Sequence, residues 1–210
     1  MIIVIDYNMG NLKSIVNMLK KSGSGAMISR SKDDILNAER LILPGVGSFD
    51  HGMENLQILG YIPLLQRKVL EEKTPILGIC LGCQLFTRRS EEGLRPGLGW
   101  IDAETVRFDF GENPSSLKIP HVGWNIAAAE RPGPLFPETH LEQRFYFVHS
   151  YHLKCSDPAD ILTTTEYGYP FTSAVSRNNI VGVQFHPEKS HRYGLEFLTR
   201  WVKWTPDRSE

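Results

Sequence analysis

The feature that most constrains this chain is a set of short apolar runs that no polar side chain interrupts. Residues 2–5, 41–43 and 76–79 have this character, and isoleucine, valine and leucine dominate them. Strands that lack polar alternation are typical of sheets covered on both faces, as parallel sheets are. Helical spacing of apolar residues follows the first run, and a further helical pattern covers residues 53–70. This alternation predicts an α/β fold with a central, mostly parallel sheet flanked by helices.

The first helix is expected to begin after Asn11, a favourable capping residue, and to end at Gly23. A last amphipathic helix is predicted over residues 195–202. The second half of the chain is richer in strands, which Gly, Pro and Asn separate; they are predicted at residues 105–108, 145–151, 161–165, 171–175 and 180–185. We expect one domain over residues 1–210, with a flexible polar tail from about residue 205.

The composition limits the partners and the compartment. A formal net charge of -1 gives no positive excess for nucleic acid. Only five apolar residues, Met1 and the run 2–5, precede Asp6, too few for a signal core or a membrane span. The three cysteines are odd in number and form no disulfide framework of the secreted kind. We therefore expect a cytoplasmic protein that binds neither nucleic acid nor a membrane.

A nucleophile elbow is predicted where the third apolar run ends. Residues 78–82 read Gly-Ile-Cys-Leu-Gly, and a helical segment begins directly after them. A sharp turn from strand to helix presents its central residue, here Cys80, and glycines two positions away remove side chains that would collide. A helix N-terminus favours the thiolate, which is the nucleophilic form. Most intracellular cysteines are small buried hydrophobes, but the paired glycines favour a nucleophile at Cys80.

The other two cysteines are interpreted as structural. Cys83 lies one helical turn after Cys80, without an elbow of its own, so we expect it to be buried rather than half of a redox pair. Cys155 is interpreted as incidental. Neither the cysteines nor the histidines show the spacing of metal ligands, and we expect no metal and no cofactor.

A base and its orienting group are predicted at His186 and Glu188. A thiol nucleophile that expels an amine needs a histidine, and the histidine needs a group that fixes its orientation. Pro187 holds the preceding residue extended, so that the two side chains tend to project to one side. The tripeptide alone is common at strand ends; its significance comes from occurring together with the elbow.

A glycine-rich segment follows the second apolar run and predicts part of an oxyanion hole. Gly45, Val46 and Gly47 lie where a sheet exposes backbone N–H groups at its carboxyl edge. The N–H of Leu81 is the second candidate donor. A glycine turn alone is a weak signal.

Taken together, these segments resemble class I (triad) glutamine amidotransferases, specifically the HisH-type glutaminase subunit of imidazole glycerol phosphate synthase. Six segments match signatures of that family in order: Leu-Pro-Gly-Val-Gly at 43–47, Gly-Ile-Cys-Leu-Gly-Cys-Gln-Leu at 78–85, Ser-Glu-Glu-Gly at 90–93, Pro-His-Val-Gly-Trp-Asn at 120–125, Phe-Val-His-Ser-Tyr at 147–151 and Gln-Phe-His-Pro-Glu-Lys-Ser at 184–190. The resemblance implies a flavodoxin-like fold with additional antiparallel strands in the second half.

The resemblance also implies roles for individual residues. Cys80 forms a γ-glutamyl thioester, His186 transfers the proton, and Glu188 orients His186. The positions that match contacts to the substrate L-glutamine are Gly47, Gln84, Ser150 and Tyr151. Residues 45–47 match an oxyanion strand that is catalytically poor until a partner signals.

The partner that the resemblance implies is a HisF-type (β/α)8 barrel synthase, which receives the ammonia. The positions that match partner-facing residues are Asn11, Pro120, His121 and Trp124. Residues 96–102 and 190–194 depart from the commonest histidine-pathway pattern and look like a paralogous group that supplies ammonia for amidating a sugar in surface-polysaccharide synthesis. Both acceptors stay open, with histidine biosynthesis first.

Two other classes of protein share some of these features. A cysteine peptidase or deglycase on a similar scaffold shares the elbow and the histidine, but Glu188 together with Gln84 and residues 149–151 favours a glutaminase. A binding or regulatory module without catalysis is disfavoured because all three candidate triad residues are present.

Overall fold

The computed structural model describes residues 1–111, 117–137 and 142–206. In these ranges ten strands form one sheet and two strands form a second. Five parallel neighbours make the centre of the large sheet, in the order β2 (Ala26–Ser29), β1 (Ile2–Ile5), β3 (Arg40–Gly45), β4 (Ile76–Cys80) and β12 (Ile180–Val183). This order is that of a flavodoxin-like, doubly wound sheet, as expected.

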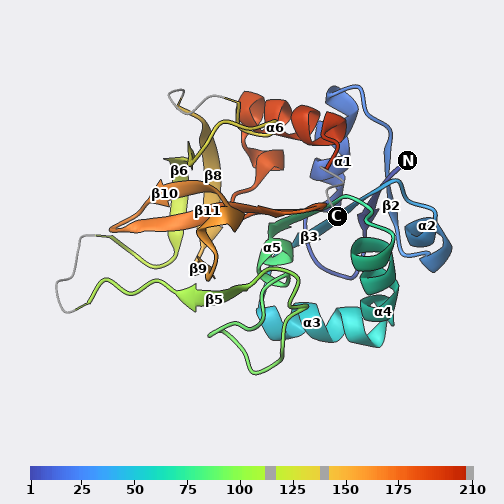
Figure 1. The fold of residues 1–210 in the computed structure, drawn as a ribbon, viewed down its shortest axis with the longest axis horizontal. Coiled ribbons are helices and arrows are strands. Elements are labelled where there is room, and N and C mark those ends of the chain that lie inside the picture. Colours follow the sequence, from blue (N-terminus) through green and yellow to red (C-terminus); the bar gives the residue numbers. More distant parts are fainter. Residues whose placement is uncertain (112–116, 138–141, 207–210) are drawn as a thin grey trace.

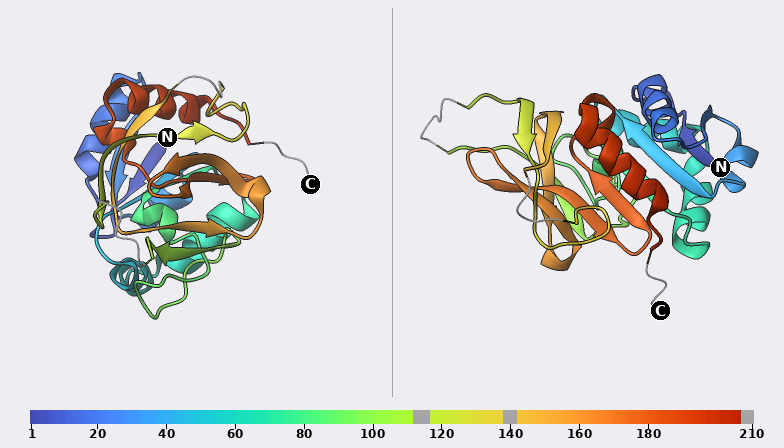
Figure 2. Two further views of the ribbon diagram at one scale, coloured as in Figure 1. Left: turned by 90° about the vertical axis from the view of Figure 1, so that its left-hand side faces the viewer. Right: turned by 90° about the horizontal axis from the view of Figure 1, so that it is seen from above.

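Helices cover both faces of the parallel strands (Figure 1). Their bounds are α1 (Leu12–Lys21), α2 (Lys32–Leu36), α3 (Phe49–Ile58), α4 (Tyr61–Gln66), α5 (Leu81–Gln84) and α6 (His191–Lys203). Alternate residues of β1 point to opposite faces: Ile3 and Ile5 belong to the core under α3 and α4, whereas Ile2 and Val4 belong to the core under α1 and α6. Figure 2 shows α1 and α6 side by side on their face, and they are in contact.

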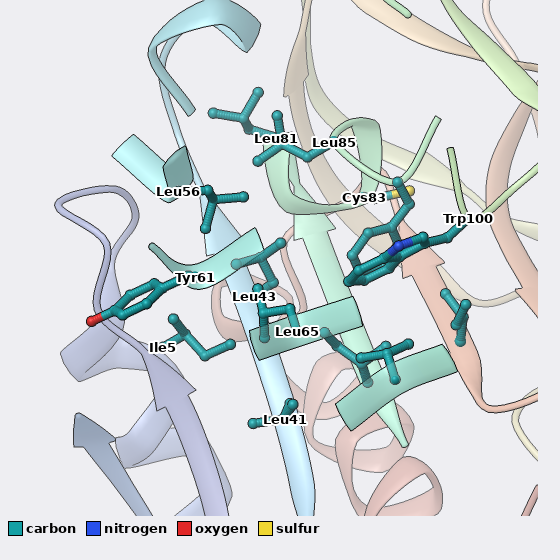
Figure 3. Close-up of a cluster of buried hydrophobic side chains, with 14 of the residues drawn as sticks. Ile5, Leu41, Leu43, Leu56, Tyr61, Leu65, Leu81, Cys83, Leu85 and Trp100 are labelled. Atoms are coloured by element: carbon teal, nitrogen blue, oxygen red, sulfur yellow. The ribbon is translucent and has the colours of Figure 1, made fainter. Parts of the chain in front are cut away.

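The core under α3 and α4 also holds the short helix that follows β4. Figure 3 shows Leu41 and Leu43 of β3 packed towards Leu65 of α4, with Leu81 and Leu85 nearby. Leu81 and Leu85 are 1% and 0% exposed. Burial of these two leucines anchors α5 to the sheet, and so fixes the turn that precedes it.

The second half of the chain extends the sheet with antiparallel strands, as the resemblance implied. They are β11 (Pro170–Arg177), β10 (Ile161–Glu166), β7 (Ala128–Ala129), β9 (Tyr151–Cys155) and β5 (Ala103–Arg107). The separate two-stranded sheet pairs β6 (His121–Ile126) with β8 (Arg144–His149). The 3-10 turns are η2 (Pro158–Asp160) and η3 (Pro187–Lys189).

Several predicted boundaries were wrong. The helix expected over residues 53–70 is interrupted at Gly60, which has a φ of 65°, and it continues as α4 and a π-helical turn, η1 (Arg67–Glu71). The elements β2, α2 and β6 were not predicted from the sequence. Asn11 holds the capping position of α1, but its side chain makes no capping hydrogen bond.

Regular secondary structure ends with α6 at Lys203. Thr205 and Pro206 belong to no helix or strand, and the rest of the predicted tail, residues 207–210, lies outside the described residues. Among the helices that the structure describes, none is long and apolar enough to span a bilayer.

Candidate active site

Cys80 lies in a strained turn between β4 and α5. Its φ of 53° is positive, which L-residues other than glycine rarely adopt. A Cβ on Gly78 would lie 2.5 Å from the Phe86 ring, and a Cβ on Gly82 would lie 1.8 Å from the carbonyl oxygen of Leu43. The expectation that these glycines prevent collisions is therefore confirmed, and the close packing of β3, β4 and α5 determines the shape of the elbow.

A cavity of about 410 Å³ opens beside Cys80 at the carboxyl edge of the parallel strands. It brings together most of the residues that the sequence placed in a site. The lining residues are Val46, Gly47, Cys80, Leu81, Gln84, Glu92, Pro120, Val148, His149, Ser150, Tyr151 and His186. Segments from both halves of the chain thus meet at one concave surface.

His186 and Glu188 form a hydrogen-bonded pair. Nδ1 of His186 lies 2.8 Å from Oε1 of Glu188, and both side chains are 2% exposed. The proximity agrees with the expectation, and His186 is extended, as predicted for the residue before Pro187. Pro187 itself then starts the 3-10 turn η3. The backbone N–H of His186 donates to the carbonyl oxygen of Tyr146 at 2.9 Å, which ties this turn to β8.

The protonation of His186 follows from its surroundings. Burial by itself lowers the pKa of His186, but its interactions with Cys80 and Glu188 outweigh burial and raise the pKa to about 9. Among the described residues, Nε2 of His186 has no hydrogen-bond partner. At neutral pH the imidazole is therefore protonated, and Nε2–H is available on the Cys80 side.

Gln184 is a site residue that was not predicted from the sequence. It is fully buried, its amide Nε2 lies 3.7 Å from the Cys80 sulfur, and its Oε1 accepts from Nε2 of Gln84 at 3.1 Å. Gln84 also donates to the carbonyl oxygen of Tyr151 at 3.1 Å. The one sequence signal was the position of Gln184 in the matching segment 184–190. Gln184 directly follows β12, and the pairing of β12 with β4 places it beside Cys80.

Glu92 is a second site residue that was not predicted. It lines the cavity, and its Oε2 accepts from the backbone N–H of Phe49 at the start of α3 at 2.8 Å. Burial raises the pKa of Glu92. A carboxylate in this cavity suits the ammonium group of an amino acid.

The glycine-rich segment after β3 divides into a buried and an exposed part. Gly45 is buried under the elbow, where a Cβ would lie 2.7 Å from Cβ of Leu81 and 2.8 Å from the hydroxyl of Tyr7. Val46 is 44% exposed and Gly47 has a φ of 109°. Val46, Gly47 and Leu81 line the cavity, whereas Gly45 supports it from below.

The residues predicted to face a partner do not share one environment. Asn11 and Pro120 are exposed, and Trp124 is 46% exposed and stacks on the His191 ring with centroids 5.5 Å apart. His121 is a correction: it is 3% exposed, because side chains alternate along β6 and His121 points to the face opposite Trp124. Its side chain is therefore not part of an exposed interface.

Cys83 is confirmed as a core residue. It is 1% exposed and lies beside Trp100 in the hydrophobic cluster of Figure 3. Burial raises the pKa of its thiol well above the ordinary value, which disfavours redox chemistry there. In the parts of the chain that the structure describes, no group of three or more His, Cys, Asp or Glu side chains is arranged to hold a metal ion.

Comparison with known proteins agrees with this geometry. Residues 3–203 match the family described as glutamine amidotransferase class-I, and the chain belongs to that family. The chain is 48% identical to the imidazole glycerol phosphate synthase subunit HisH 2 of Pseudomonas aeruginosa, over 97% of this chain and 99% of the relative. It is 52% identical to the protein of the same name from Methanococcus maripaludis, with the same coverage.

Solved structures support the fold. A structure described as a glutamine amidotransferase superposes with a TM-score of 0.70 at 19% identity, covering 95% of this chain and 98% of the other. A glutamine amidotransferase from Thermotoga maritima gives a TM-score of 0.63 at 17% identity, covering 96% of this chain and 80% of the other.

Proposed function

We propose that this chain is the glutaminase subunit of an imidazole glycerol phosphate synthase, which hydrolyses L-glutamine to glutamate and ammonia. The observation that carries the proposal is Cys80 in a strained elbow beside the buried His186–Glu188 pair, in a cavity of amino-acid size. Relatives of 48% and 52% identity that bear the subunit's name support it.

The proposed reaction begins with attack of the Cys80 sulfur on the side-chain amide carbon of glutamine. The protonated His186 gives its proton to the departing ammonia, which leaves a γ-glutamyl thioester. A water molecule then loses a proton to His186 and attacks the thioester, releasing glutamate. Glu188 keeps Nδ1–H of His186 oriented and stabilises the imidazolium.

The oxyanion that forms in both steps needs N–H donors. We propose the backbone N–H of Leu81, at the start of α5, and an N–H of the Gly45–Gly47 segment. Because Val46 and Gly47 are exposed, this second donor is the part of the site that a docked partner can change.

The substrate contacts follow from the cavity walls. We place the α-amino group of glutamine near Glu92, and the rest of its backbone against Gln84, Ser150 and Tyr151. Gln184 supports the Cys80 sulfur with its amide. No cofactor takes part in this reaction.

The proposed partner is a HisF-type (β/α)8 barrel subunit that covers the cavity and receives the ammonia. The proposed contacts are the exposed Pro120, which lines the cavity, and the exposed Trp124 and Asn11. Both halves of the chain build the cavity, which supports our proposal of one domain over residues 1–210. A cytoplasmic location remains our prediction.

The decisive experiment is co-expression with the cognate barrel subunit, followed by measurement of glutamate release with and without an acceptor. We expect low activity of the isolated chain, a rise with the acceptor-loaded barrel, and formation of imidazole glycerol phosphate. Amination of a sugar acceptor instead would assign the chain to the paralogous pathway. Absence of glutamate release under every condition would refute the glutaminase and leave a peptidase or a non-catalytic module.

A further inference from the structure

The inner face of the β6–β8 sheet carries a chain of buried polar side chains that the proposed chemistry does not use. His121 and His149 stand directly opposite each other in the register of the two strands, and they are 3% and 6% exposed. Nδ1 of His121 lies 3.1 Å from Nε2 of His149. A direct hydrogen bond between two buried imidazoles requires that one ring donates and the other accepts.

The partners at the two ends of this row of hydrogen bonds determine which ring donates. Nδ1 of His149 lies 2.8 Å from the carbonyl oxygen of Tyr151, which can only accept, so His149 carries its proton on Nδ1. A neutral His149 then accepts at Nε2, and His121 must donate from Nδ1. Nε2 of His121 in turn accepts from the side-chain amide of Asn125, 3.3 Å away. Every hydrogen bond therefore runs in one direction, from Asn125 through both histidines to Tyr151.

Two further observations agree with this assignment. Asn125 is held in the matching orientation, because its Oδ1 accepts from the backbone N–H of Ile126 at 2.8 Å and its amide also donates to the carbonyl oxygen of Glu166 at 2.9 Å. Burial lowers the pKa of His121 to about 4 and that of His149 to about 3. Both rings are therefore neutral at pH 7, as the chain of hydrogen bonds requires.

This row of hydrogen bonds ends at the substrate cavity. The carbonyl oxygen of Tyr151 receives a second hydrogen bond from Gln84, and Gln84, Ser150 and Tyr151 all line the cavity. The other face of β6 exposes Val122 and Trp124, which are 55% and 46% exposed. One strand therefore presents an apolar surface on one face and holds the start of the hydrogen-bonded chain on the other.

We infer that His121 and His149 are positioning residues that fix the Ser150–Tyr151 segment for glutamine binding and link it mechanically to β6. The inference deepens the proposed function and rests on it for its kinetic consequence. The two rings do not touch the reacting atoms; they set the place of a carbonyl oxygen that also orients Gln84. Removing a link of the chain weakens substrate binding more than it slows the chemical steps.

The first test does not depend on activity. Two-dimensional ¹H–¹⁵N spectra of the imidazole nitrogens, recorded at pH 7, separate the two neutral tautomers. We expect both His121 and His149 to carry the proton on Nδ1. A proton on Nε2 of either ring, or a protonated ring, would overturn the inference whether or not the chain is a glutaminase.

The second test measures glutamine hydrolysis in the complex with the barrel subunit. His149→Leu is expected to raise KM for glutamine about tenfold while kcat changes less than about threefold. His149→Asn keeps an N–H donor at the place of Nδ1, and it is expected to restore KM to within about threefold of the unmodified protein. His121→Leu, outside the cavity lining, is expected to raise KM in the same direction but less.

His152→Leu is the matched control. His152 is also 6% exposed and packs on the same Phe108 and Phe171 rings as His149, but its nitrogens contact the Tyr169 hydroxyl and the Leu153 carbonyl oxygen instead. It is expected to lower stability without a rise in KM. An equal rise in KM for His152→Leu, or an unchanged KM in His149→Leu, would refute the positioning role. If the unmodified complex released no glutamate, the proposed function would fail while the tautomer test still applied.

Discussion

Two glycine-rich turns follow neighbouring parallel strands, and they differ in how firmly the fold holds them. The elbow after β4 is enclosed: Cβ atoms on Gly78 and Gly82 would collide with Phe86 and with the Leu43 carbonyl oxygen. The turn after β3 leaves the core at Gly45; Val46 is 44% exposed, and a Cβ on Gly47 would meet only the end of the Met9 side chain, at 3.1 Å. The proposed nucleophile is thus held within the core, whereas the proposed oxyanion donor after β3 is at the surface.

This difference shows how the nucleophile can be held in place while the oxyanion donor stays open to control by a partner. Close packing fixes Cys80, Gln184 and the His186–Glu188 pair without a partner. The segment with Val46 and Gly47 lacks such packing, so a protein docked over the cavity can alter it at little cost to the core. We therefore expect glutaminase activity to depend on the partner even though the proposed nucleophile and base are already in place.

The largest expected effect comes from Cys80→Ala. With the barrel and acceptor present, glutamate release should fall on the order of 10⁴-fold or more, because no other thiol lines the cavity in the described residues. Cys155→Ala is the control and should keep full activity. A wild-type rate in Cys80→Ala would show that Cys80 is not the nucleophile.

The next effect concerns the base. Glu188→Gln should reduce kcat about 10²- to 10³-fold, because the imidazolium loses its carboxylate partner. With the pKa of His186 near 9, the alkaline decline of kcat/KM should be centred near that pH. Loss of the Glu188 charge lowers the pKa of His186, and the decline should move to lower pH. An unchanged pH profile would show that Glu188 does not hold this proton.

Gly82→Ala tests the packing of the elbow. The added methyl group meets the Leu43 carbonyl oxygen at 1.8 Å, so the free energy of unfolding should fall by about 3 kcal/mol, measured by urea denaturation. Gly25→Ala, where nothing lies within 4 Å of the added atom, should change stability by about 0.5 kcal/mol or less. Equal stability of both variants would mean that the elbow is not held by packing.

Gly47→Ala should lower stability less than Gly82→Ala does, and it should have a selective effect on function. A φ of 109° is unfavourable for alanine, and the strain should lower the free energy of unfolding by about 1–2 kcal/mol. Activation by the loaded barrel should fall about tenfold, while covalent labelling of Cys80 by an electrophilic glutamine analogue continues. If Gly47→Ala abolished both the labelling of Cys80 and the activation by the barrel, the turn after β3 would not act independently of the elbow after β4.

Much of this site could be predicted from the sequence because its parts are local. The run 76–79 followed by Gly-Ile-Cys-Leu-Gly predicts a strand and an elbow within a few residues, and His186 and Glu188 are two positions apart. The helix over residues 53–70 was predicted less well, because its apolar spacing continues across Gly60 although the left-handed conformation there ends α3.

The sequence by itself determined the fold class, since uninterrupted apolar strands alternating with amphipathic helices can be buried only as a covered parallel sheet. Only the tertiary structure decided which residues meet. Parallel pairing of β12 with β4, with Val183 opposite Ile79, brings Gln184 and His186 to Cys80 across more than one hundred residues of chain. The inward side of β6 was likewise set by its pairing with β8, which turned His121 from an expected surface residue into a buried one. Contacts between distant segments depend on which strands are neighbours in the sheet, and a local sequence pattern does not show which distant strands will pair.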